Sequence, residues 1–242
     1  NKSNFLPVFI LQSINDLIFQ FGLRKSHVIS QTHYQKQKLL QNFLKKSTVI
    51  GNGNRLPKNS YKKTNPPTVS WVANIKKNKN PFVFVKLARL FEDHDIRFVM
   101  VGRVSSPNFK KILDGHTKKS KNFDYIGELP YEKAYDLIAS SDIFVNTSFD
   151  EGFPNTFVQA WLTHTPVLTL GIDPDEQIKE NMLGVVCPNL EIMARTLKEL
   201  LDDRKKLKLL SQKSFEYSSK NCHIDIINLR RKEFMESLIR QV

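Results

Sequence analysis

The most informative stretch of the sequence is DIFVNTSFDEGFPNTFVQAWLTHTPVLTLG, residues 142–171. It opens with a short apolar run at 142–146, passes through a polar loop, and continues with apolar residues at helical spacing over 155–163. A second apolar run follows at 166–170. Pro154 suits the first turn of a helix, because its ring presets the backbone angle found there. Strand, loop, helix and strand in this order predict a βαβ unit with two parallel strands.

The same alternation of short apolar runs and amphipathic helices extends on both sides of this stretch. Further strands are predicted at 68–73, 96–101, 123–126 and 185–186, and further helices at 81–91, 108–119, 131–140 and 190–201. This alternation predicts a Rossmann-like, doubly wound parallel sheet that helices cover on both faces. In such a sheet ligands bind outside the carboxyl ends of the strands. Glycines follow four of the predicted strands, at Gly102, Gly127, Gly152 and Gly171.

The chain before and after this region is organised less regularly. The predicted order at the start is a helix over 5–23, a strand at 27–30, a helix over 31–44 capped by Thr32, and a strand at 48–50. The segment 55–67 is rich in Pro, Asn and Lys and poor in apolar residues, which is typical of a linker. Two basic helices with a break near Asn221 are predicted after residue 203.

The chain has a net charge of +13, from 37 Lys and Arg against 24 Asp and Glu. This excess favours anionic partners such as nucleotide phosphates, an anionic lipid surface or nucleic acid. An equally weighted alternative is that the lysines are spread over a solvated surface. No run reaches the ~18 apolar residues that a membrane-spanning helix needs. No motif for specific nucleic-acid readout is present in the sequence.

The cysteine content indicates the compartment. Cys187 and Cys222 cannot form a disulfide framework, and nothing near them has metal-ligand spacing. A reducing, cytoplasmic setting is therefore expected. Because the sequence begins with Asn1 and not with Met, we also expect further sequence, or a whole domain, upstream.

The loop between the first strand and the helix of the quoted stretch carries the chemistry. Gly152 permits backbone shapes that other residues resist. The N–H groups of Asn155, Thr156 and Phe157 are predicted to point out of the helix end, where a diphosphate would bind. Glu151 would repel a phosphate, but it suits the hydroxyls of a sugar attached to that phosphate. The alternative is that Glu151 lies at the surface and that Asn155 and Thr156 cap the helix without touching a ligand.

Around this loop the sequence resembles glycosyltransferase family 4, whose members have the GT-B fold and transfer sugars with retention of configuration. The resemblance rests first on EGFPNT at 151–156, with Gln159, Ala160 and the Thr-Pro-Val at 165–167. Further matching segments are WVANIKKNKNP at 71–81, FVMVG at 98–102, YIGEL at 125–129 and VISQT at 28–32. The match covers most of the chain from about residue 24, and the combination of segments is specific.

The resemblance implies a role for each matching residue. Lys79 and Glu151 would be the catalytic residues, with Lys79 on the donor diphosphate and Glu151 on the hydroxyls of the transferred sugar. Ile126 would hold the base through its backbone, and Gln159 would lie near the ribose. The other implied donor-binding residues are Gly102, Tyr125, Gly152, Phe153, Pro154, Asn155 and Thr156. No metal and no cofactor are implied, because the nucleotide diphosphate sugar is itself the co-substrate.

Two positions depart from the family pattern. Gln159 stands where the family usually has an acid, and Asn74 stands where it usually has an arginine before the lysine. A carboxylate accepts two hydrogen bonds from a ribose diol, whereas a glutamine offers one acceptor and a donor amide, which weakens the contact. Arg103, Lys76 or Lys77 would then supply the missing cation. Because of these departures, the alternative remains that the chain is a relative of the family that binds the donor without transferring the sugar.

The expected function is that of a retaining hexosyltransferase with a saccharide or a lipid-linked acceptor. A less favoured alternative is a basic module that binds membrane surfaces or nucleic acid. A cytoplasmic enzyme, peripheral on the inner face of the membrane, fits both the lysines and such acceptors. The implied domains are the tail of an N-terminal acceptor-side domain at 1–54, a linker at 55–67, a nucleotide-sugar domain at 68–220 and a C-terminal crossover helix at 221–242.

Overall fold

The computed structural model describes residues 8–57, 61–104 and 106–240, and it divides into two compact units, Asn1–Gly51 and Asn52–Val242. Parts of three predicted segments lie outside the described residues. They are the start of the helix predicted over 5–23, the middle of the linker predicted over 55–67, and the end of the segment 221–242.

The first unit has the predicted order of helix, strand, helix and strand. It contains α1 (Val8–Lys25), β1 (Val28–Ser30), α2 (His33–Phe43) and β2 (Ser47–Val49), and β1 pairs with β2 in parallel. The Thr32 hydroxyl accepts a hydrogen bond of 3.1 Å from the Gln35 amide, which confirms the predicted cap of α2.

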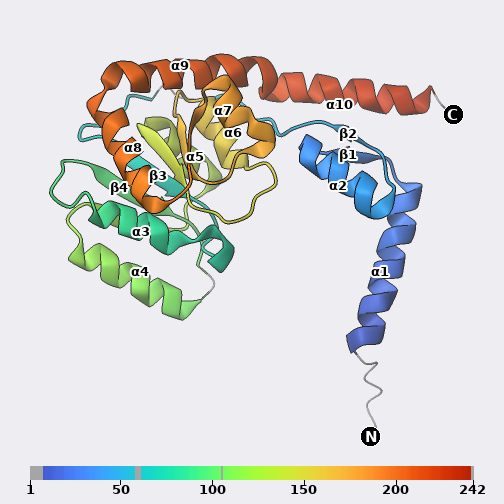
Figure 1. Cartoon of the computed structure of the whole chain (residues 1–242), viewed down its shortest axis with the longest axis horizontal. Helices are drawn as coiled ribbons and strands as arrows, with labels where there is room; N and C mark the ends of the chain where they lie inside the picture. Colours follow the sequence, from blue (N-terminus) through green and yellow to red (C-terminus); the bar gives the residue numbers. More distant parts are fainter. Residues whose placement is uncertain (1–7, 58–60, 105, 241–242) are drawn as a thin grey trace, which may run out of the picture. The chain divides into compact units, whose positions relative to one another are not determined.

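The second unit is built on one sheet of six parallel strands (Figure 1). They are β3 (Thr68–Val72), β4 (Arg97–Val101), β5 (Phe123–Gly127), β6 (Ile143–Asn146), β7 (Val167–Leu170) and β8 (Gly184–Cys187). Their spatial order is β5-β4-β3-β6-β7-β8, which is the order of the doubly wound dinucleotide-binding fold. The predicted Rossmann-like parallel sheet is confirmed. The strand order reverses between β3 and β6, and doubly wound sheets bind ligands in a crevice outside the carboxyl ends of the strands at such a point.

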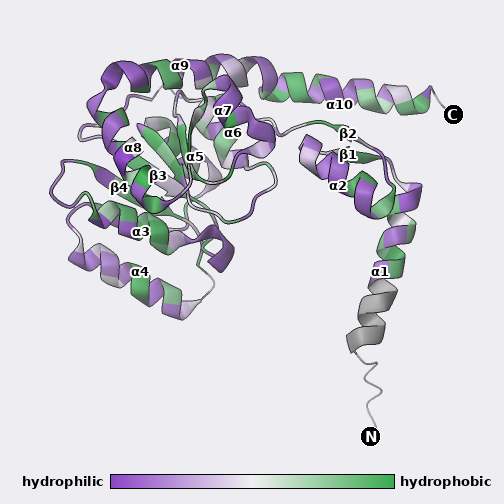
Figure 2. Ribbon diagram, in the orientation of Figure 1, coloured by the Kyte–Doolittle hydropathy of each residue, from purple (hydrophilic) through white to green (hydrophobic). Residues whose placement is uncertain are grey.

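Helices cover both faces of this sheet (Figure 1). One face packs against α3 (Pro81–Arg89), α4 (Pro107–Lys119) and α8 (Leu190–Asp202), and the other against α5 (Tyr131–Ser140) and α6 (Asn155–Trp161). Both faces of the sheet are apolar, and this is why helices cover both. Along β6, for example, Ile143 and Val145 belong to one buried cluster while Phe144 belongs to the other. Figure 2 shows this apolar content concentrated in the strands. Trp71 and Trp161 are buried, one in each cluster.

The rest of the second unit follows the prediction less closely. The two predicted terminal helices are α9 (Arg204–Asn221) and α10 (Ile224–Ile239). Three short elements were not predicted, namely η1 (Lys77–Lys79), η2 (Pro174–Glu176) and α7 (Gln177–Asn181). The helix predicted over 155–163 ends earlier, at Trp161, because the amides of Thr163 and His164 donate to carbonyls three residues back and not four. His164 itself takes a left-handed backbone angle φ of 57°. Its ring stacks on Phe215 with the centroids 4.0 Å apart.

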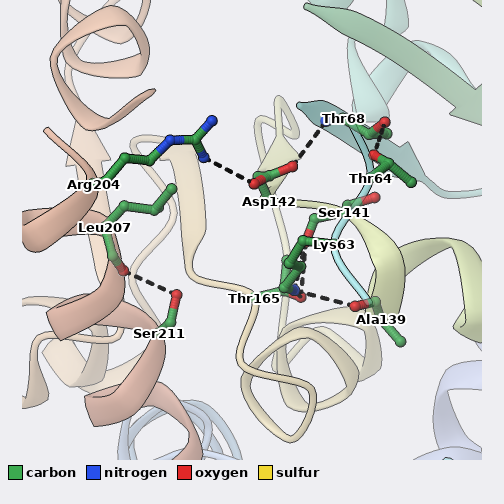
Figure 3. A network of polar contacts seen from close by, with 10 residues as sticks. All are labelled: Lys63, Thr64, Thr68, Ala139, Ser141, Asp142, Thr165, Arg204, Leu207 and Ser211. Atoms are coloured by element: carbon green, nitrogen blue, oxygen red, sulfur yellow. Dashed lines mark hydrogen bonds and ion pairs between the residues drawn. The ribbon is translucent and has the colours of Figure 1, made fainter. Parts of the chain in front are cut away.

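The segment before β3 is fastened to the amino end of the sheet. The Lys63 ammonium donates hydrogen bonds to the carbonyls of Ala139 (3.1 Å) and Ser141 (2.6 Å) and to the Thr165 hydroxyl (2.7 Å) (Figure 3). Burial lowers the pKa of Lys63 from 10.5 to about 8, against the opposing effect of the Asp142 carboxylate. Part of the segment predicted as a linker is therefore held by a buried cation.

Lys63 is expected to make the free energy of unfolding depend on pH. Because the pKa of Lys63 is lower in the folded chain, the unfolded chain binds more protons between about pH 8 and pH 10, and stability rises with pH in that window. Relative to Lys63→Met, the stability of the unmodified chain should rise by about 2 kcal/mol from about pH 7.5 to about pH 9.5. Urea denaturation of both proteins at the two pH values measures this, and a difference that stays constant would contradict it.

The helix predicted over 108–119 is α4, and it is basic, with Lys110, Lys111, Lys118 and Lys119. Lys110 is paired with Asp114 at 2.7 Å. An anionic partner for this helix stays a prediction, as does a cytoplasmic or membrane-peripheral location. Within the described ranges, no helix is long and apolar enough to cross a bilayer.

Candidate functional site

Two loops meet at the crevice between β3 and β6. The β3 loop (residues 73–80) follows β3, and the β6 loop (residues 147–154) follows β6. β3 and β6 are hydrogen-bonded neighbours that run in parallel, so both loops leave the sheet at the same edge. This edge is the ligand-binding edge of a doubly wound sheet.

Hydrogen bonds join the two loops into one wall. The Thr147 hydroxyl accepts from the Trp71 indole N–H at 2.9 Å and donates to the carbonyl of Lys79 at 2.8 Å. The Phe149 amide donates to the Asn78 carbonyl at 2.9 Å. A buried tryptophan thus anchors the start of the β6 loop, and that loop in turn fixes the end of the β3 loop.

The two predicted catalytic residues lie together on this wall. The Lys79 ammonium lies 2.5 Å from Oε1 of Glu151, and η1 brings Lys79 into this position. The same oxygen accepts hydrogen bonds from the Ser148 hydroxyl (2.7 Å) and from the Asn146 amide (3.4 Å). The side chains of Lys79 and Glu151 are 20% and 12% exposed. Solvent therefore reaches the pair but screens it less than an ion pair on the open surface.

This pair offers a ligand both a cation and a hydrogen-bond acceptor. Within the described residues, Glu151 is the hydrogen-bond partner of the Lys79 ammonium, which keeps further N–H donors for a ligand. A diphosphate would compete with Glu151 for the cation, and sugar hydroxyls could then donate to the carboxylate. The structure describes no cluster of His, Cys, Asp or Glu that could hold a metal ion in the ranges it covers.

Gly102 allows the β3 loop to lie against the end of β4. A Cβ at this position would lie 1.8 Å from the carbonyl oxygen of Ala73, so no larger residue fits without moving the backbone. Just beyond, the Ile75 amide donates to the Arg103 carbonyl at 2.9 Å. Asn74 and Arg103 therefore lie on neighbouring segments, and both side chains are exposed. This placement is compatible with Arg103 supplying the cation that Asn74 lacks.

The predicted base-binding residue lies at a β-bulge. Tyr125 and Gly127 pair with consecutive residues of β4, so Ile126 is the extra residue, and its side chain is 48% exposed. The Tyr125 hydroxyl donates to the Gly102 carbonyl at 3.0 Å, and burial raises the pKa of Tyr125. Bulges are frequent next to active sites, and the role predicted for Ile126 stays a prediction.

The backbone amides at the start of α6 are predicted to bind a diphosphate. Phe153 and Pro154 are buried, while Asn155 is exposed and Thr156 is half-buried. One expectation is wrong, because the Phe157 amide donates to the Pro154 carbonyl at 3.1 Å and is not available to a ligand. The first turn closes with a bond to the third residue back, a tighter closure than that of an α-helix. The amides of Asn155 and Thr156 remain the candidates at this end.

Two further predicted residues flank this turn. Gly152 is exposed in the β6 loop. Gln159, in α6, is only 6% exposed, and its contact with a ribose stays a prediction.

Three residues at the site were missed by the sequence reasoning. Asn146 and Ser148 orient Glu151, and the Asn52 amide donates to the Phe153 carbonyl at 2.7 Å. Ser148 lies in the stretch 142–171, and Asn146 ends a predicted strand, which is a position where ligand-edge residues occur. No local signal marks Asn52, because its partner lies 101 residues away.

Comparison with known proteins assigns the family. The sequence model of the family described as glycosyl transferases group 1 matches residues 54–217, and the chain belongs to this family. The matched residues include both loops of the crevice. A comparison with curated protein sequences finds no match.

The fold matches solved GT-B glycosyltransferases at low sequence identity. A glycosyltransferase from Rickettsia africae superposes with a TM-score of 0.79 at 18% identity, over 99% of this chain and 69% of the other. Sucrose-phosphate synthase from Thermosynechococcus elongatus gives 0.74 at 15%, over 95% and 63%. The pneumococcal O-GlcNAc transferase GtfA, solved with UDP and GlcNAc, gives 0.75 at 17%, over 93% and 48%. The chain thus spans less than two thirds of the last two proteins.

Proposed function

We propose that the crevice between β3 and β6 binds a nucleotide diphosphate sugar, and that the protein transfers the sugar with retention of configuration. One observation carries the proposal: the cation of Lys79 and the carboxylate of Glu151 meet at 2.5 Å on two loops at the strand-order reversal. Membership of the glycosyl transferases group 1 supports the reaction class. The complex of GtfA with UDP and GlcNAc supports this class of donor. The proposed acceptor is a saccharide or a lipid-linked saccharide.

In the proposed reaction the protein positions the reacting groups and stabilises the charge on the leaving diphosphate. The bond between the anomeric carbon and the diphosphate oxygen breaks, and the acceptor oxygen forms a bond on the same face of the sugar. The acceptor proton passes to the departing diphosphate. Lys79 stabilises the negative charge that grows on this leaving group, and Glu151 holds the sugar hydroxyls in place. Neither role requires a protein nucleophile.

Gln159 and Asn74 set the expected strength of donor binding. Both positions carry neutral amides, and neutral hydrogen bonds are roughly half as strong as charge-assisted ones. We therefore expect a donor affinity below that of a site with both charges. A relative that binds the donor without transfer is the competing proposal, and release of free sugar from the bound donor distinguishes the two.

A thermal-shift screen of the whole chain with UDP, GDP and their sugar conjugates tests the proposal. At a concentration of about 100 times its own Kd, the cognate nucleotide should stabilise the chain by about 2.7 kcal/mol. The same concentration of its sugar conjugate should stabilise the chain further. AMP at the same concentration serves as the control for nonspecific anion binding. If no nucleoside diphosphate or sugar conjugate shifts the melting temperature more than AMP does, the donor-site assignment is wrong.

A further inference from the structure

The first residues of the second unit form a connector, defined as residues 52–55, that is fixed along its length. The Tyr131 hydroxyl donates to the Asn54 side-chain oxygen at 2.5 Å, and the Tyr135 hydroxyl donates to the Arg55 carbonyl at 2.9 Å. Both tyrosines belong to α5, which packs on the sheet. The connector is therefore attached to the same body that carries the crevice.

The connector is also locked into the junction between α9 and α10. The backbone amide of Asn54 donates to the Cys222 carbonyl at 3.0 Å. The backbone amide of Ile224 donates to the backbone carbonyl of Asn54 at 2.9 Å. A Cβ on Gly53 would lie 2.7 Å from Cγ1 of Ile227, so the backbone here lies directly against α10. These contacts leave the connector little freedom to shift within the second unit.

From this fixed connector, Asn52 reaches the β6 loop. Its side-chain amide donates to the Phe153 carbonyl at 2.7 Å. The start of the loop is held separately, through the bond from the Phe149 amide to the β3 loop. Between the hydrogen-bonded residues Phe149 and Phe153, Asp150 and Gly152 are exposed and Glu151 is half-buried. The Asn52 bond thus fixes the far end of the segment that carries Glu151 and leads into α6.

We infer that Asn52 is a positioning residue for the donor site, an inference that rests on the proposed function. Its hydrogen bond fixes the orientation of the Phe153 peptide, and that peptide sets where Glu151 and the amides of Asn155 and Thr156 lie. Removing the amide frees the Phe153 carbonyl to turn toward water. The loop must then be ordered at the moment of binding, which lowers affinity without removing any group that contacts the donor.

Three variants test this bond. Asn52→Ala removes the donor, and Asn52→Asp keeps the size of the side chain but places a carboxylate against a carbonyl oxygen. Tyr131→Phe is the matched control, because it removes a hydrogen bond from the same connector but not the one to the β6 loop. Two quantities are measured on the whole chain. They are the Kd of the nucleoside diphosphate that stabilises the unmodified chain, and the hydrogen exchange of the amides at 151–157.

We expect Asn52→Ala to raise the Kd by about 3- to 10-fold, the effect of one hydrogen bond, and to speed exchange at 151–157. Asn52→Asp should raise the Kd at least as much, whereas Tyr131→Phe should change neither quantity. A purely structural role would instead lower the melting temperature of all three variants together and leave exchange at 151–157 no faster than elsewhere.

The outcomes separate this inference from the proposed function. If the unmodified chain binds a nucleotide and both Asn52 variants bind it equally well with unchanged loop exchange, the role of Asn52 is refuted while the donor site stands. If no nucleotide binds to the unmodified chain, the proposed function fails and this inference fails with it. Asn52→Asp keeps the test decisive if Asn52→Ala does not fold, because it preserves packing at this position.

Discussion

Replacing Lys79 by alanine is expected to weaken binding of the nucleoside diphosphate by about 10- to 100-fold, the range for a charge-assisted hydrogen bond. The physical reason is that the Lys79 cation faces the ligand edge of the sheet from a loop whose end is fixed by Thr147. Glu151→Ala should behave differently. It frees Lys79 from its 2.5 Å partner, so the affinity for the bare nucleoside diphosphate stays the same or increases.

The two variants therefore separate the two proposed roles. Glu151→Ala should abolish the extra affinity that the attached sugar provides, while Lys79→Ala should lower the affinity for both ligands. Calorimetry with the nucleoside diphosphate and with its sugar conjugate measures both effects. Lys86→Ala and Asp150→Ala are the matched controls, because both residues are exposed, Lys86 on α3 and Asp150 next to Glu151. Equal losses for both ligands in Glu151→Ala would refute the assignment of this carboxylate to the sugar.

Replacing Gly102 by alanine is expected to destabilise the second unit by about 3 kcal/mol or more. The added Cβ would lie 1.8 Å from the Ala73 carbonyl oxygen and 2.9 Å from its carbon. Both contacts are with backbone, so no side chain can rotate away to relieve them. The strands β3 and β4 would have to separate where the β3 loop begins, and the site would lose its shape along with its stability.

Gly115 provides a control for the general effect of replacing glycine by alanine. It lies inside α4, and nothing lies within 4 Å of where its Cβ would be. Gly115→Ala should therefore stabilise the chain by about 0.5 to 1 kcal/mol. Urea denaturation of the two variants measures the contrast. If Gly102→Ala is as stable as Gly115→Ala, the close approach of Ala73 to Gly102 is not present in the protein.

Much of the second unit could be predicted because its strands are short, apolar and regularly spaced. Residues such as Val69, Phe98 and Ile143 are fully buried in the sheet, and burial on both faces produces continuous apolar runs. The strand order could not be obtained in this way, since periodicity does not tell which strands are neighbours. That β3 lies beside β6 is a property of the assembled sheet, and it is this pairing that brings the two loops together.

The short elements were missed for a different physical reason. α7 has five residues, which are too few to show helical periodicity in the sequence. Asp175 and Glu176, which precede it, take positive φ angles that no sequence pattern predicts. The amide of Phe157 was assigned to a ligand because an ordinary helix start would leave it unpaired, but the first turn of α6 closes more tightly.

The candidate site was predicted mainly through family resemblance. Lys79 lies among other lysines and amides, and its position in the crevice depends on η1 and on Thr147, neither of which has a local signature. The supporting residues Asn52, Asn146 and Ser148 act through specific side-chain hydrogen bonds. Such bonds depend on distances that exist only once the chain has folded.

A crystal structure of the chain with its cognate nucleotide sugar is the decisive test of the donor site. We predict that the diphosphate lies at the carboxyl ends of β3 and β6 within hydrogen-bond distance of the Lys79 ammonium, and that a sugar hydroxyl donates to Glu151. We also predict that the 2.5 Å contact between these two side chains lengthens as the diphosphate binds the cation. A donor bound elsewhere, with the pair of Lys79 and Glu151 intact, would refute the proposed site.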